Sequence, residues 1–136
     1  IPPTISLITD SALYASDYCL IVMQTHEHSF EGAEAFIKYI QDEVIDDYKA
    51  PRLELVGILA VLLQAGAPVD EATVANAINE FGEGNIFKTR IHSMQRLKRY
   101  GITGITFGTK FDKRVFKVYQ DVTNELLKRI EVIEHG

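Results

Sequence analysis

The chain has a single cysteine, Cys19, and no tryptophan among its 136 residues. One cysteine excludes an internal disulfide framework, and its place in an apolar run predicts a buried thiol. No apolar run approaches the roughly 20 residues that a membrane-spanning helix requires, so we expect no membrane partner. No secretory signal is visible, and the default prediction is a cytoplasmic protein.

Glycine-rich phosphate-binding motifs are also missing. The sequence contains neither G-x-x-x-x-G-K-[ST] nor G-x-G-x-x-G. Such loops bind phosphate through backbone amides and a lysine, so this segment cannot build its own phosphate cradle.

The net charge of −5 is divided unevenly along the chain. Residues 1–87 carry three basic and fourteen acidic side chains, whereas residues 88–129 carry eleven basic and three acidic ones. Two interpretations are open. Either a basic C-terminal face meets an anionic partner, or the two parts neutralise each other across the fold.

Apolar patterning predicts an α/β fold. Continuous apolar runs at 18–23 and 53–63 are typical of strands buried on both faces in a parallel sheet. Helices alternate with the strands, so we expect a parallel sheet flanked by helices. The remaining elements are predicted as a strand at 85–91, an edge strand at 102–107, and helices at 4–15, 29–47, 71–81, 93–97 and 110–133.

Helix ends are predicted from capping residues. Ser29, Asp70 and Ser93 are expected N-caps, and Thr109 with Asp112 forms an approximate capping box. The expected core positions of the last helix are Val115, Tyr119, Val122, Leu126 and Ile130.

Ligands of parallel sheets bind beyond the carboxyl ends of the strands, here residues 24–29, 63–68 and 91–95. The cluster His26-Glu27-His28 lies in the first of these loops. Two histidines two residues apart in a loop are a weak metal signal, and we predict no metal site.

Basic side chains gather in the C-terminal part of the chain. Lysines and arginines at the start of a helix oppose its dipole, so a face that accepts this cost is suited to phosphates. A solvated helix face is the alternative. The candidate DNA-binding residues are Arg96, Lys98, Arg99, Lys110, Lys113, Arg114 and Lys117.

Taken in order, several segments resemble the ParA-type partition ATPases, which segregate plasmids and chromosomes. The segments that carry the resemblance are Pro2–Ile5, Ala12–Tyr18, Leu20–Gln24 with Glu27, Ser29–Gly32, Leu55–Leu59, Phe87–Ile91 with Arg96-Leu97, and Tyr119–Arg129.

The resemblance implies that residues 1–136 are a single partial domain, the C-terminal portion of a P-loop NTPase-like three-layer fold. In that family an aspartate before the Pro-Pro pair and an upstream phosphate loop handle Mg²⁺ and ATP. We therefore expect no catalytic side chain on this segment, which would be inactive alone. The implied switch-loop residues are Pro2 and Pro3, and the implied adenine-side residues are Leu63, Gln64, Ile91, His92 and Ser93.

The resemblance also implies partners: non-specific DNA, a centromere-binding protein and a second copy in an ATP-dependent homodimer, within a nucleoid-associated cytoplasmic protein. This sequence departs from the family pattern at 64–66, at His92 and at Arg99. A non-enzymatic DNA- or protein-binding α/β module is the alternative function.

Overall fold

The computed structural model describes residues 7–42, 52–64 and 66–136. In the described part, three strands form one parallel sheet in the order β1-β2-β3. The strands are β1 (Tyr18–Gln24), β2 (Glu54–Leu63) and β3 (Ile91–His92). The predicted α/β class with a parallel sheet is therefore confirmed.

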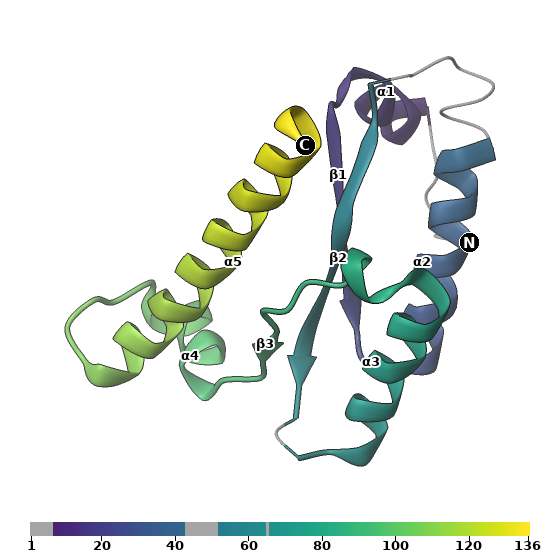
Figure 1. Ribbon diagram of the computed structural model, residues 1–136. Coiled ribbons are helices and arrows are strands. Elements are labelled where there is room, and N and C mark those ends of the chain that lie inside the picture. The colour runs from purple at the N-terminus through teal and green to yellow at the C-terminus, as the bar shows by residue number, and fades with distance from the viewer. Residues whose placement is uncertain (1–6, 43–51, 65) are drawn as a thin grey trace.

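Helices lie on both faces of the sheet (Figure 1). One face carries α2 and α3, and the long C-terminal helix α5 crosses the other face. The short helix α4 and its connection to α5 lie at the far end of α5 from the C-terminus (Figure 1). The helices are α1 (Leu7–Ala15), α2 (Glu27–Tyr39), α3 (Pro68–Phe81), the 3₁₀ turn η2 (Glu83–Asn85), α4 (Gln95–Thr103) and α5 (Lys110–His135).

The core consists of apolar layers above and below β2. Ile21 and Met23 of β1 pack with Ile58 against α2 and α3, and Leu59 packs with Phe87 under α5. Gly57 makes this second layer possible, because a Cβ at this position would lie 2.8 Å from the Phe87 ring. A glycine at this point lets the ring rest directly on the strand.

Strand β1 is not buried on both faces, contrary to the prediction. Val22 is exposed although its neighbours Ile21 and Met23 are buried. Helix α5 runs obliquely across this face, and Tyr18 and Leu20 of β1 pack against the core layer beneath it. The Tyr18 hydroxyl donates a hydrogen bond to Glu134 near the end of α5 (2.5 Å), which raises the pKa of Tyr18 to about 12.

The third strand is far shorter than the predicted range 85–91. Besides β3, this segment makes one isolated bridge, Ile58 to Ile86. Its backbone bonds to α5 instead, because Glu125 accepts hydrogen bonds from the Lys88 and Thr89 amides, both 2.8 Å. These amides are therefore not available for a regular sheet ladder.

Arg129 is the second half of this attachment. Its guanidinium donates to the carbonyls of Val56 (3.3 Å), Gly84 (2.8 Å) and Ile86 (2.9 Å), and it lies 4.4 Å from the centroid of the Phe87 ring. Arg129 also pairs with Glu125 one helical turn earlier, at 3.1 Å. One side chain thus joins α5 to β2 and to the segment that follows η2.

Several helix ends differ from prediction. His26, not Ser29, caps α2, because its ring nitrogen accepts from the Ser29 amide at 3.2 Å. Ala67 precedes α3, and Met94 precedes α4. Helix α4 continues through Gly101 to Thr103 and takes up part of the predicted edge strand 102–107, which does not form.

The predicted capping box is confirmed, because Thr109 and Asp112 form it at the start of α5. Gly82 ends α3 with a positive φ of 91°. Tyr119 is exposed, and Val118 takes the core position predicted for it. The predicted continuation of α2 over residues 43–47 lies outside the described residues.

We predict that Arg129→Ala lowers the free energy of unfolding by about 2–4 kcal/mol, because three carbonyls and Glu125 lose their partner in a half-buried site. Urea unfolding followed by circular dichroism measures this change. The matched control is Lys128→Ala, the neighbouring exposed cation, which should change stability by less than about 0.5 kcal/mol. Equal effects of the two variants would contradict the role given to Arg129.

Candidate functional site

The carboxyl ends of β1 and β2 meet at one edge of the sheet, and Asp70 connects them. Its carboxylate accepts hydrogen bonds from the Gln64 amide (2.6 Å) and from the Thr25 hydroxyl (2.8 Å). These two bonds, the Gln64 amide first, lower the pKa of Asp70, and His92 adds a smaller contribution. Asp70 therefore lies within the first turn of α3 and joins two strand-end loops, instead of capping the helix as predicted.

The five predicted adenine-side residues lie around this edge, but they differ in solvent exposure. Leu63 and Ile91 are buried in the core layers, whereas Gln64 and His92 are exposed. The Ser93 amide donates to the Leu63 carbonyl at 2.8 Å, which holds the loops after β2 and β3 together. Gln64, His92 and Ser93 are thus the members of this set whose polar groups border the edge.

Asp70 is not among the site residues that the sequence predicts. Its signal in the sequence is an acidic residue directly after Pro68-Val69, a position that also suits an ordinary helix start. Its partners Thr25 and Gln64 are 45 and 6 residues away. Only the folded arrangement shows that it connects two loops.

The other candidate residues from the sequence, two histidines and Cys19, have structural contacts or are partly buried. His26 serves as the cap of α2, and its ring lies 6.4 Å from that of His28. Among the described residues, no three His, Cys, Asp or Glu side chains gather as metal ligands. Cys19 is half-buried, and burial raises the pKa of its thiol, which disfavours the reactive thiolate. Pro2 and Pro3 lie outside the described residues.

A basic face covers α4 and the start of α5. We use this name for the exposed cations Lys98, Arg99, Lys110, Lys113, Arg114 and Lys117. Lys117 pairs with Asp121 on its own helix at 2.5 Å. Of the ion pairs between described residues, one joins the basic part of the chain to the acidic part, Arg90 with Glu71 at 3.6 Å. The acidic part of the chain therefore does not neutralise the basic face, which keeps its positive charge.

Arg96 differs from the other predicted DNA-binding residues. Its side chain is only 18% exposed, and its Nε lies 3.7 Å from the carboxylate of Asp112. Its guanidinium also lies 5.3 Å from the centroid of the Phe111 ring. Arg96 is thus held against the protein and supports the junction of α4 with α5.

Asp112 is the centre of that junction and is fully buried. Its carboxylate accepts from the hydroxyls of Tyr100 (2.5 Å) and Thr106 (2.8 Å) and from the Thr109 amide (3.1 Å). The hydrogen bond from Tyr100 is the largest cause of a pKa well below the ordinary aspartate range, and it outweighs the opposing effect of burial. A charged carboxylate with this many donors is the stable form of the site.

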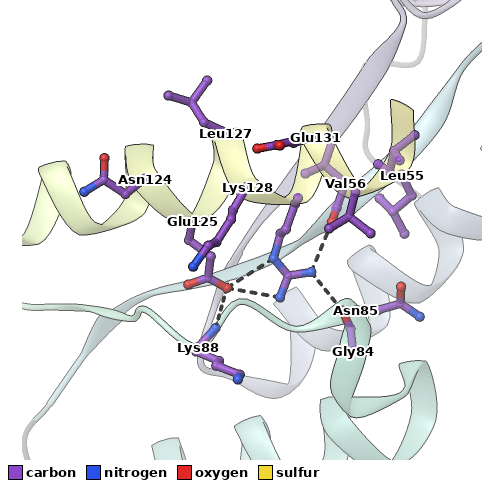
Figure 2. A pocket seen from close by; sticks show the side chains of 13 residues that line it. Leu55, Val56, Gly84, Asn85, Lys88, Asn124, Glu125, Leu127, Lys128 and Glu131 are labelled. Carbon is purple, nitrogen blue, oxygen red and sulfur yellow. Dashed lines mark hydrogen bonds and ion pairs between the residues drawn. The ribbon is translucent and has the colours of Figure 1, made fainter. Parts of the chain in front are cut away.

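A shallow groove separates the second half of α5 from β2 and η2 (Figure 2). Its volume is about 840 Å³, and its walls include Leu55, Val56, Leu127 and Val132. The charged pair Glu125–Arg129 lies along it, but these groups are already engaged with the backbone. Besides its apolar wall, the groove is lined by the polar side chains of Asn85, Lys88, Asn124, Lys128 and Glu131.

We predict that Asp112→Asn lowers the urea midpoint of unfolding at about pH 7, because the charged acceptor of three hydrogen bonds is removed. The lowered pKa means that Asp112 stabilises the fold above its ordinary pKa of about 3.9 and stops doing so as the pH falls through the lowered value. Urea midpoints from about pH 7 to pH 2 should fall less steeply for the variant. Parallel curves for the two proteins would contradict this account.

The N-terminal part of the chain is similar to a known domain family. Residues 1–55 match the family model described as an AAA domain, and no curated protein matches the chain. The match includes α1, β1 and α2 and ends within β2. Together with the parallel three-layer arrangement, it indicates an ATPase-type, nucleotide-binding origin for this region, and it is compatible with the resemblance drawn from the sequence. The basic face lies outside the matched residues.

Proposed function

We propose that this chain is part of an ATP-dependent partition ATPase that binds DNA non-specifically through its basic face. The observation that carries the proposal is the group of exposed cations on α4 and α5. Acidic side chains elsewhere in the fold neutralise few of these cations. The family match of residues 1–55 and the parallel sheet support the ATPase part.

Nucleotide would bind at the strand-end edge. Gln64, His92 and Ser93 border this edge, and Asp70 holds two of its loops in place. Phosphoryl transfer depends on positioning and on electrostatic stabilisation of the transferred group. An upstream phosphate loop, Mg²⁺ and an aspartate ahead of the Pro-Pro pair would supply both, so we assign no catalytic role to the side chains of this chain.

DNA contact requires no base-specific geometry in this proposal. Lysines and arginines that neutralise phosphates release condensed counterions, and this release drives sequence-independent binding. ATP would promote a homodimer that places two basic faces on one duplex, and a centromere-binding protein would stimulate hydrolysis.

We predict that Arg99→Ala with Lys113→Ala weakens duplex binding equally for unrelated sequences. The slope of log affinity against log salt should become shallower by roughly 0.9 for each phosphate that the variant no longer neutralises. Fluorescence anisotropy with two unrelated duplexes measures both quantities. Lys38→Ala with Lys128→Ala, which removes two exposed cations away from the face, is the matched control.

Unchanged affinity in the Arg99/Lys113 variant, or an equal reduction in the control, would contradict the proposed face. Arg96→Ala is a poor substitute test, because Arg96 also pairs with the buried Asp112. Weaker DNA binding by that variant would combine an effect on phosphate binding with an effect on folding.

The ATPase part predicts a difference between this chain and the product of its complete gene. The complete protein should bind ATP and need it for tight DNA binding, whereas the 136-residue chain should bind no ATP at micromolar concentrations. Isothermal titration calorimetry distinguishes these results. Micromolar ATP binding by the chain alone contradicts the division of roles. Nucleotide-independent DNA binding by the complete protein favours the alternative, a non-enzymatic DNA- or protein-binding module.

A further inference from the structure

The end of α4 and its connection to α5 carry exposed apolar side chains. Ile102 is 88% exposed and Phe107 72%, and Ile105 between them is exposed as well. We call these three residues the apolar tip. Large apolar side chains grouped on a projecting surface, with cations around them, indicate an interaction site more often than isolated exposed ones do.

The outward direction follows from the hydrogen bonds of the same connection. Tyr100, Thr106 and Thr109 turn their polar groups inward to the buried carboxylate of Asp112. Ile105 and Phe107, on either side of Thr106, are exposed, and the Phe107 ring stacks on that of Phe116 at 5.3 Å between centroids. Turning Ile102 or Ile105 inward would break bonds to a buried charge, which is costly.

The charged side chains near the apolar tip in the sequence are almost entirely cationic. Between residues 95 and 118 there are seven basic side chains and one acidic one, and that one is the buried Asp112. A hollow of about 510 Å³ beside the tip is lined by Arg96, Lys98, Arg99, Ile102, Phe111 and Gln95. The surface therefore combines a hollow lined by three cations with exposed apolar side chains next to it.

The cations and the exposed apolar side chains together limit the kind of partner that can bind this surface. Duplex DNA would pair with the cations, as proposed above, but it would not account for the exposed Ile102, Ile105 and Phe107. A neutral apolar groove on another protein would cover the tip but leave the cations unpaired. The interface of an anionic bilayer offers phosphates at the surface and acyl chains a few ångströms below, so it satisfies both.

We propose that the apolar tip inserts into the headgroup region of an anionic membrane, with Lys98, Arg99 and Lys110 on lipid phosphates. The connection lies at the end of α5 opposite the C-terminus, away from the sheet (Figure 1). None of the described helices is long and apolar enough to cross a bilayer. The expectation of no membrane partner rests on that criterion, which does not concern peripheral binding.

The test is co-sedimentation of the chain with phosphatidylcholine vesicles that contain or lack phosphatidylserine. Binding should require phosphatidylserine and should weaken with salt. Ile102→Ser with Ile105→Ser should reduce vesicle binding at least about tenfold while all cations remain. Lys98→Gln with Arg99→Gln should reduce it by about fivefold for each cation.

Each variant has a matched control away from the face. Ile8→Ser with Val69→Ser removes two exposed β-branched side chains from α1 and α3 and should leave vesicle binding unchanged. Lys38→Gln with Lys128→Gln does the same for charge. Unfolding curves of the variants separate an effect on binding from an effect on folding.

The Ile102/Ile105 variant also separates this inference from the proposed function, because it keeps every cation that DNA would contact. Abolished vesicle binding with normal DNA binding supports the inference. No binding to phosphatidylserine vesicles, equal binding to neutral ones, or an equal reduction of DNA binding overturns it. The inference is also overturned if the chain is a dimer and the Ile102/Ile105 variant is a monomer, because a second copy would then cover the apolar tip.

Discussion

The contact of Arg129 and Glu125 with the backbone of residues 56 and 84–89 is the interaction on which the rest of this arrangement depends. Helix α5 touches the sheet obliquely and leaves Val22 uncovered, so apolar packing alone specifies its angle poorly. The guanidinium has fixed donor directions, and it bonds three carbonyls from two separate segments. This contact positions α5 and, through it, the basic face at its other end.

A second buried charge organises that other end. Asp112 collects donors from α4, from the connection and from the start of α5, while Arg96 closes the cluster at 3.7 Å. Inward polar groups force apolar side chains outward, so the same carboxylate that stabilises the junction also creates the apolar tip. The proposed DNA contact and the inferred membrane contact therefore share one rigid support. They differ in their dependence on Ile102 and Ile105.

Much of the fold could be predicted from local pattern. The two strands predicted from apolar runs, β1 and β2, are confirmed as strands, and so is the Thr109–Asp112 capping box. These signals involve residues that are close in sequence. The strand predicted at 85–91 is wrong because Glu125, 36 residues away from Thr89, takes its amides. Of the candidate site, local pattern locates the loops and the exposed cations. It does not locate Asp70, whose role depends on Thr25.

The sequence by itself determined the α/β class, the parallel strands and the separation of charge, because periodicity and composition depend on side-chain type alone. Only the tertiary structure decided which charges remain for a partner. Arg96, Arg129 and Glu125 look like ordinary surface charges in the sequence, yet their charged groups are engaged in partly buried ion pairs. Whether a charge is buried depends on residues brought together from distant positions, so no local pattern distinguishes them from Lys98 or Lys113.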